Sequence, residues 1–132
     1  MKISRLKVAF KDSRGSILDI LDDVDLNSAT LITNKKGAVR ANHFHKKTIQ
    51  YTFVLSGRVK YVGKGPGGRK TAVLKAGDLA ISPPNEAHAT EALTDATFLA
   101  LSYGPRHGHN YEADTYRLAL PLIAPKKKAS RK

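Results

Sequence analysis

The chain has no cysteine, and its 11 acidic residues are outnumbered by 23 lysines and arginines. Without cysteine it can hold no disulfide, no thiolate zinc site and no cysteine nucleophile. It also lacks any apolar run near the roughly 20 residues that span a bilayer. Residues 1–10 alternate charged with apolar side chains instead of forming a signal-peptide core. We therefore expect a soluble, cytoplasmic protein with no membrane partner.

The length of 132 residues suits one compact domain, which buries roughly two-thirds of its unfolded surface. Separate domains for a cofactor and a substrate do not fit, so we expect no organic cofactor. Any chemistry must use histidine, carboxylate, arginine, lysine, tyrosine or a bound metal. We assign residues 1–125 to the domain. Residues 126–132 are rich in lysine and have no apolar periodicity, and we predict that they form a disordered basic tail.

The net charge of +12 falls to +7 for residues 1–125, because five cations lie in the tail. An excess of positive charge raises the local concentration of anionic ligands such as nucleic acid, a phosphorylated sugar or an acidic saccharide. Alternatively, the charge serves only solubility. Nucleic acid is the weakest candidate, because the sequence has no known nucleic-acid motif and its aromatic residues do not alternate with basic ones. We expect an anionic small-molecule substrate.

Short apolar stretches separated by glycine, proline, aspartate and asparagine recur along the chain, whereas long helical patterns do not. Many short strands at such spacing predict an all-β sandwich or barrel. The expected strands include Ile3–Phe10, Ile17–Leu21 and Thr115–Leu120. The apolar residues between 17 and 24 also fit helical spacing, so a helical turn is the alternative there.

Two stretches carry candidate site residues. In a strand, residues two apart face the same side, so His43 and His45 project together while Phe44 faces away. Gln50 follows and can add its amide oxygen. If the second stretch pairs antiparallel with the first, His88 joins them in the interior. A single histidine in a strand is usually structural, but three at this spacing favour a site that binds a metal or transfers protons.

The spacing of these stretches resembles the paired motifs of the cupin superfamily. The matching positions are Gly37, His43, His45, Gln50 and Gly57 in the first motif and Gly77, Pro83 and His88 in the second. Gln50 stands at the position of an acid or amide, and Asn85 stands where the second motif usually has glycine. The resemblance implies a single-domain, small antiparallel cupin (jelly-roll) barrel.

Three imidazoles and an amide oxygen suit one divalent transition metal, either Zn, Ni, Fe, Mn or Cu. Its ligands would be His43, His45, Gln50 and His88. Glutamine in place of the usual glutamate removes a negative charge, which weakens the binding of hard ions and favours an amide that orients a substrate hydroxyl. Both roles remain open for Gln50.

Three further segments carry a closer resemblance: Asp12-Ser13-Arg14-Gly15, Arg40-x-x-His43-x-His45 and Asp114-Thr115-Tyr116-Arg117. They look like cupins of bacterial sugar-nucleotide metabolism, above all the dTDP-4-keto-6-deoxyglucose 3,4-ketoisomerases. They are also similar to the metal-carrying cupin domain of capsular polysaccharide reductases. The resemblance implies a nucleotide-sugar substrate, a role in polysaccharide biosynthesis, a homodimer, and proton transfer by His43 and His45. Ala41 departs from the glycine that usually follows the arginine.

Such chemistry removes a proton next to a ketone, stabilises an enediolate and returns a proton to the neighbouring carbon. Histidine, with a pKa near 6.5, suits both transfers. We therefore expect a sugar-nucleotide isomerase or epimerase. The alternatives are a metal-dependent cupin enzyme, such as a dioxygenase or a uronate-processing enzyme, and a non-catalytic carbohydrate-binding or regulatory cupin.

Three other residues are candidates for substrate binding. Arg14 can bind a diphosphate through two parallel hydrogen bonds. Alternatively, it can pair with Asp12 or Asp114 and so hold a loop in place. Arg40 lies three residues before His43, so it faces the opposite side unless a bulge intervenes. Tyr103 ends an apolar strand and can stack on a base or sugar.

Overall fold

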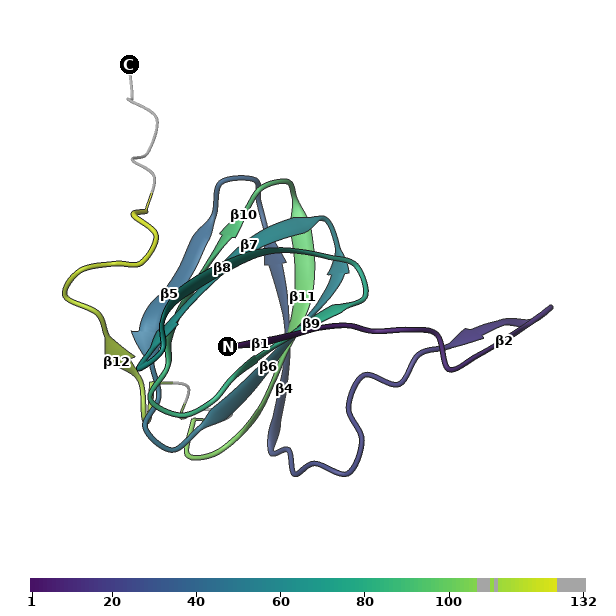
Figure 1. Ribbon diagram of the computed structural model, residues 1–132, viewed down its shortest axis with the longest axis horizontal. Coiled ribbons are helices and arrows are strands. Elements are labelled where there is room, and N and C mark those ends of the chain that lie inside the picture. Colours follow the sequence, from purple (N-terminus) through teal and green to yellow (C-terminus); the bar gives the residue numbers. More distant parts are fainter. Residues whose placement is uncertain (107–109, 111, 126–132) are drawn as a thin grey trace, which may run out of the picture.

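A computed structural model describes residues 1–106, 110 and 112–125 (Figure 1). Its strands, in chain order, are β1 (Lys2–Arg5), β2 (Phe10–Asp12), β3 (Gly15–Ile17), β4 (Ser28–Asn34), β5 (Val39–Phe44), β6 (Ile49–Ser56), β7 (Arg58–Gly65), β8 (Gly68–Lys75), β9 (Asp78–Ser82), β10 (Ala87–Ala92), β11 (Ala96–Tyr103) and β12 (Tyr116–Arg117). The described residues include no helix long and apolar enough to cross a membrane.

Ten of these strands form two antiparallel five-stranded sheets, and β2 pairs with β3 in a separate hairpin. The first sheet has the order β1-β9-β6-β11-β4, and the second has the order β12-β5-β10-β7-β8. The two sheets curve around a common interior, while the β2–β3 hairpin extends away from them (Figure 1). The prediction of a single-domain antiparallel barrel is confirmed.

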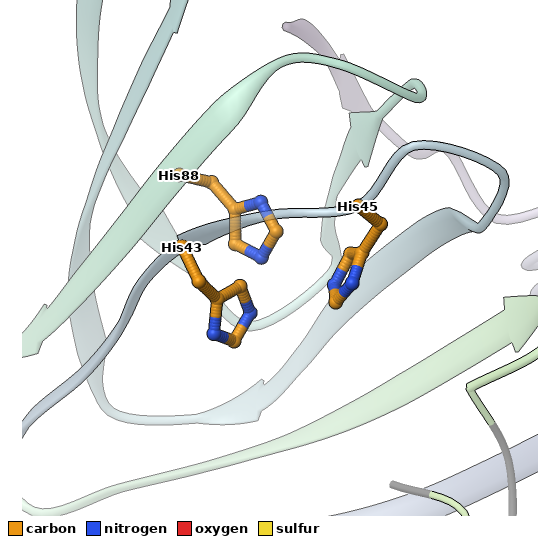
Figure 2. Close-up of side chains that lie close together, drawn as sticks. All are labelled: His43, His45 and His88. Atoms are coloured by element: carbon orange, nitrogen blue, oxygen red, sulfur yellow. The ribbon is translucent and has the colours of Figure 1, made fainter. Parts of the chain in front are cut away.

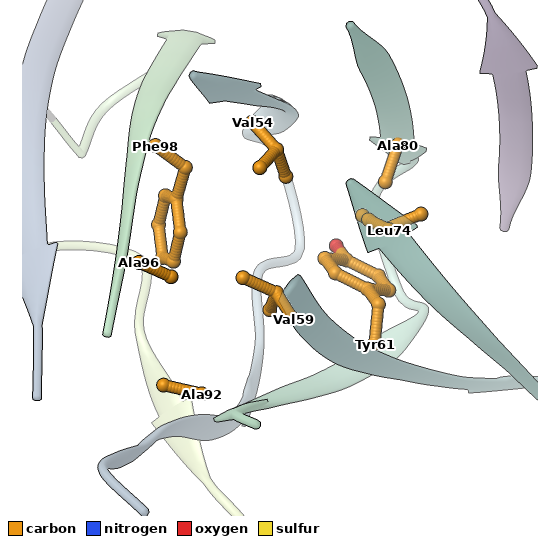
Figure 3. Packing of buried hydrophobic residues seen from close by; sticks show 8 residues of the cluster. All are labelled: Val54, Val59, Tyr61, Leu74, Ala80, Ala92, Ala96 and Phe98. Atoms are coloured by element: carbon orange, nitrogen blue, oxygen red, sulfur yellow. The ribbon is translucent and has the colours of Figure 1, made fainter. Parts of the chain in front are cut away.

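One half of the interior is a solid apolar core (Figure 3). Its buried members come from both sheets and are Val54, Val59, Tyr61, Leu74, Ala80, Ala92, Ala96 and Phe98. Strand periodicity explains their convergence, because alternate residues of each strand face the interior. At the edge of this core, the buried hydroxyls of Tyr61 and Ser82 hydrogen-bond to each other.

A tight turn joins β6 to β7, as the Ser56-Gly57 pair predicted. Gly57 has a φ of +79°, and a Cβ atom there would lie 2.2 Å from the carbonyl oxygen of Asp95. Only glycine therefore fits both the backbone conformation and the space.

Strand β5 contains a bulge immediately before the His-x-His pair. Ala41 and Asn42 both adopt left-handed conformations, with φ values of 71° and 57°. Against β10, His43 pairs with His88 and Ala41 pairs with Ala89, so Asn42 is the extra residue. The Asn42 side chain hydrogen-bonds to the C-terminal segment. Its Oδ1 accepts from the backbone N–H groups of residues 122 and 123, at 2.8 and 3.1 Å. Its Nδ2 donates to the carbonyl oxygen of residue 123, at 2.9 Å.

Three predicted strands differ from the structure. The strand expected over Ile3–Phe10 splits into β1 and the start of β2. The segment after Ile17 forms neither the expected strand nor a helix. Leu18, Ile20 and Leu21 instead cover the apolar outer face of the first sheet, against Tyr51, Phe53 and Leu79. Burial of these side chains, rather than backbone pairing, determines the path of this segment.

The strand expected over Thr115–Leu120 is reduced to the two residues of β12. It pairs with the end of β5, where Tyr116 lies opposite Phe44. The backbone N–H of Leu118 then donates to the carbonyl oxygen of Asn42, and this contact directs the chain towards the outer face of the second sheet. The tail expected at residues 126–132 lies outside the described residues.

Candidate active site

His43, His45 and His88 converge inside the barrel (Figure 2), where His88 stacks on Tyr61 of the apolar core. Strand β5 supplies His43, the residue after that strand is His45, and β10 supplies His88. The ring centroid of His43 lies 4.8 Å from that of His45 and 4.7 Å from that of His88, and the third separation is 5.4 Å. The strand pairing predicted from the two motifs therefore brings the three imidazoles together.

A cavity of about 190 Å³ lies beside His43 and His88, and His45 is not among its described lining residues. Its polar lining comprises Arg40, His43, Gln50, Thr52, His88, Thr90 and Arg106. None of the described lining residues carries a carboxylate, whereas two of them are arginines. The cavity therefore favours an anionic or electron-rich group.

The bulge in β5 explains how Arg40 reaches this cavity. Regular alternation would place Arg40 and His43 on opposite faces, but one extra residue between them restores a common face. The Arg40 guanidinium is held at the rim, where Nε donates to Asn34 Oδ1 at 2.7 Å and Nη2 donates to the Thr33 carbonyl oxygen at 3.1 Å.

The geometry also explains two departures from the usual motifs. Ala41 stands where glycine is usual, and its φ of 71° is a conformation that glycine adopts without strain. Asn85, in the second motif, has a φ of 69°, and asparagine tolerates this region better than most residues with a side chain. Its backbone N–H donates to the carbonyl oxygen of His45 at 2.6 Å, which links the two motifs.

The three imidazoles are neutral in the folded protein. Burial, followed by the positive charges around it, lowers the pKa of His43 to about 3, and burial also lowers the pKa of His88 to about 3. The pKa of His45 falls for the same reason, although a hydrogen bond to the backbone of residue 114 opposes the change. Each ring therefore keeps a lone pair near neutral pH, which can bind a metal or hold a proton transiently during a reaction.

Several ring nitrogens are buried without hydrogen-bond partners among the described residues. By strict hydrogen-bond geometry they are Nδ1 of His43, Nε2 of His45 and both ring nitrogens of His88. The Gln50 side chain and the Glu86 backbone nevertheless lie close enough to His45 and His88, respectively, to oppose the lowering of their pKa values. By contrast, Nδ1 of His45 lies 2.9 Å from the carbonyl oxygen of Asp114. A carbonyl oxygen only accepts, so Nδ1 carries the proton and Nε2 of His45 keeps a lone pair.

Arg106 is the site residue that the sequence reasoning missed. It follows β11 in the Gly104-Pro105-Arg106 segment, where no strand periodicity indicates its direction. Its Nε is buried without a partner among the described residues, and its charge helps to lower the pKa of all three histidines. Burial lowers the pKa of Arg106 itself.

Two predicted substrate-binding residues lie apart from the histidines in this chain. Arg14 is on the outlying β2–β3 hairpin (Figure 1), where its guanidinium pairs with Asp12 at 2.6 Å, the structural alternative that the sequence allowed. Tyr103 is 47% exposed and follows the inward-facing, buried Ser102. Gln50, by contrast, lines the cavity. Substrate binding by Arg14 and Tyr103 stays a prediction.

A family model described as a Cupin domain matches residues 30–104, a span that covers more than half of the chain and includes all three histidines. The chain is a cupin. This result agrees with the paired motifs and with the two-sheet barrel. No curated protein sequence matches the chain.

Solved structures with the same fold include enzymes of nucleotide-sugar metabolism. A sugar 3,4-ketoisomerase from Thermoanaerobacterium thermosaccharolyticum, in complex with TDP, is 24% identical, with 89% of this cupin and 88% of that chain covered and a TM-score of 0.70. A TDP-quinovose 3,4-ketoisomerase from Campylobacter jejuni is 19% identical, with coverage of 89% and 92% and a TM-score of 0.72. A dTDP-4-dehydrorhamnose 3,5-epimerase from Sulfolobus tokodaii is 23% identical, with coverage of 74% and 69% and a TM-score of 0.60. These likenesses establish a shared fold.

Proposed function

We propose that this cupin is an isomerase or epimerase of a nucleotide sugar and that it moves protons next to a keto group. The main support is the set of neutral, buried imidazoles beside a cavity that contains arginines and no carboxylate among its described lining residues. The same fold serves the ketoisomerases and the epimerase named above. In this proposal, the keto-sugar occupies the cavity and the nucleotide lies outside it.

Of the two catalytic candidates, His43 lines the cavity, whereas His45 is the one whose Nδ1 has a hydrogen-bond partner, so we assign the role of the first base to His45. Its Nε2 lone pair is buried and faces the interior, while its proton is held at Nδ1 by the Asp114 carbonyl oxygen. Removal of the proton next to the ketone creates negative charge on oxygen, and Arg106 supplies positive charge at the same cavity. His43, which is neutral, then accepts this proton from His45 and passes it to the neighbouring carbon, so that both imidazoles return to the neutral form. Each such transfer contributes about 10²- to 10⁴-fold to the rate.

The proposal includes a homodimer. Phe10 and Ile17 on the β2–β3 hairpin are 52% and 57% exposed, and an isolated two-stranded hairpin is marginally stable in water. A second copy of the chain would cover these apolar side chains. Sedimentation at micromolar concentration tests this part separately, and a monomer would exclude it.

Solvent-deuterium exchange tests the activity. Purified cupin is incubated in D₂O with dTDP-4-keto-6-deoxyglucose, and deuterium in the sugar is followed by mass spectrometry. We expect incorporation by the wild type and a loss of about 10²-fold or more in H45Q and H43Q, whereas K75Q on the outer strand β8 keeps the wild-type rate. Calorimetry with the same sugar is run in parallel. Binding without exchange would contradict the proposal and support a non-catalytic carbohydrate-binding cupin.

A metal-dependent enzyme is the second candidate, because the unpartnered ring nitrogens also suit a metal. The ligand atoms of His43, His45 and His88 lie within 4.8 Å of one another, and all three rings are neutral, as metal binding requires. These residues would hold one divalent transition metal, with the Gln50 amide oxygen beside them. A bound metal would act as a Lewis acid on a carbonyl oxygen. Zn, Ni, Fe, Mn or Cu at one equivalent in purified protein, lost in H88A, would support this function over a metal-free enzyme.

A further inference from the structure

Asp114 closes the loop that follows His45. Its carboxylate accepts from the backbone N–H groups of Lys46, Lys47 and Thr48, at 3.0, 2.8 and 2.8 Å, and from the Thr48 hydroxyl at 2.9 Å. Burial alone would raise the pKa of Asp114, but these hydrogen bonds lower it below its ordinary value. The carboxylate therefore stays ionised and holds the loop at neutral pH.

The backbone of the same residue contacts the imidazole. The carbonyl oxygen of Asp114 lies 2.9 Å from Nδ1 of His45. Asp114 has a φ of 55°, in the left-handed region that aspartate reaches more readily than most residues. In this conformation the Asp114 carboxylate hydrogen-bonds to the loop of residues 46–48 while its backbone carbonyl contacts the His45 imidazole.

The contacts of Asp114 bear on which ring nitrogen of His45 keeps a lone pair in the barrel interior. The hydrogen bond made by one ring nitrogen determines the tautomer of a neutral histidine. With the proton fixed on Nδ1, Nε2 can accept a proton. The opposite tautomer would present an N–H to the substrate and leave the carbonyl oxygen of Asp114 without a donor.

The loop clamped by Asp114 also reaches the cationic side of the cavity. Thr48 is fully buried, and a Cβ atom on Gly104 would lie 2.5 Å from its Oγ1, so the chain before Arg106 packs directly on this loop. The backbone N–H of Arg106 makes a long hydrogen bond to the same Oγ1, at 3.5 Å. Displacement of the loop would therefore move both His45 and Arg106.

We propose that Asp114 is a positioning residue that holds His45 in the Nδ1–H tautomer and so leaves the buried Nε2 with a lone pair inside the three-histidine cluster. The catalytic consequence rests on the proposed function, whereas the tautomer does not. The Asp114 carboxylate binds the loop of residues 46–48. It is therefore not the partner of Arg14, which was one of the alternatives that the sequence left open.

The tautomer can be measured directly in the free protein. Two-bond ¹H–¹⁵N correlation spectra of ¹⁵N-histidine-labelled cupin at pH 7.5 distinguish the two forms, and H45Q assigns the signal. We expect Nδ1–H in the wild type. In D114G, where glycine accepts the φ of 55° but the carboxylate is gone, we expect the Nε2–H form or a mixture. D114N keeps an oxygen acceptor and should restore most of the wild-type spectrum. D12N removes the charge of a half-buried aspartate at the end of β2, on the outlying hairpin, and serves as the matched control.

The exchange assay supplies the second readout. We expect kcat in D114G to fall about 10- to 100-fold, with KM nearly unchanged, and to recover in D114N. An Nε2–H tautomer in the wild type, or an unchanged tautomer in folded D114G, would overturn the inference even if the enzyme turns over a sugar. A changed tautomer with unchanged kcat would also overturn it. If the wild type catalyses no exchange, the proposed function fails while the tautomer result still stands.

Discussion

The two halves of the barrel interior are built by the same strands but differ in chemistry. Along β6 the inward residues change from Gln50 and Thr52 to Val54, and along β10 they change from His88 and Thr90 to Ala92. One half is thus a packed apolar core, and the other encloses a cavity of about 190 Å³. Apolar burial stabilises the first half, at roughly 25 cal/mol per Å². Buried, unpartnered ring nitrogens make the second half costly to fold.

This difference leads us to expect that the fold depends on its apolar half and not on its histidines. In this view the polar half lowers the stability of the barrel. Substitutions should therefore separate the two halves by the sign of their effect on the free energy of unfolding.

The largest effect is expected in the apolar half. Leu74 has no exposed surface, so Leu74→Ala should lower the free energy of unfolding by about 2–5 kcal/mol through lost burial and a residual cavity. Leu120, 84% exposed, is the matched control, and Leu120→Ala should leave the urea midpoint unchanged. Similar midpoints for both variants would refute the division of the interior.

Acid should destabilise the protein through its polar half. In the unfolded chain His88 titrates near 6.5, but in the folded protein burial lowers its pKa to about 3. Below pH 6.5 the unfolded state therefore binds the proton first, and stability falls as the pH is lowered towards 3, by up to about 1.4 kcal/mol per pH unit. His43 acts in the same direction. Urea unfolding between pH 7.5 and 5, above the range of ordinary carboxylates, should show this slope, and a flat profile would contradict it.

Replacing a histidine of the site should stabilise the fold while abolishing activity. Neither ring nitrogen of His88 makes a hydrogen bond of good geometry among the described residues, although the Glu86 backbone lies nearby, so His88→Leu relieves poorly satisfied buried groups and should add about 1–3 kcal/mol. The same variant should show a shallower pH slope. Tyr61→Phe removes a buried hydroxyl that does have a partner, Ser82, and should destabilise the protein. If His88→Leu also destabilises it, the polar half contributes to stability after all.

The smallest effect concerns the bulge beside the site. Ala41 has a φ of 71°, and a left-handed conformation costs an alanine roughly 1–2 kcal/mol. Ala41→Gly should therefore raise the free energy of unfolding by about 1 kcal/mol. The thermal midpoint should rise slightly as a result. Ala29→Gly, in the regular strand β4, should lower the midpoint. Two shifts of the same sign would show that the conformation of Ala41 is not strained.

The sequence predicted those parts of the site that depend on strand alternation. His43 and His45 lie two apart, and the second motif brings His88 opposite them, so periodicity and antiparallel pairing were sufficient. The turn at Gly57 followed from its neighbours in the same way. These features depend on short-range geometry, which a sequence records directly.

Long-range contacts could not be predicted in this way. Arg106 enters the cavity from an irregular segment, and Asp114 contacts His45 across 69 positions of the chain. The path of residues 18–21 depends on an apolar sheet face that exists only after folding. The position of Arg40 was conditional on a bulge, and the unusual Ala41 was the one local signal of it.

Because β5 contains one extra residue, the strand can be shortened by one residue without turning its inward face outward. If either Ala41 or Asn42 were deleted, Arg40 and His43 would be two apart and would still face inward in a regular strand. The cost would fall outside the barrel, where Asn42 fastens residues 122 and 123. Single-residue deletions are usually harmful within a sheet, but deletion of Asn42 should leave Arg40 and His43 facing inward while it releases residues 122 and 123. Deletion scanning, and not only substitution, is thus a practical route to redesign this strand.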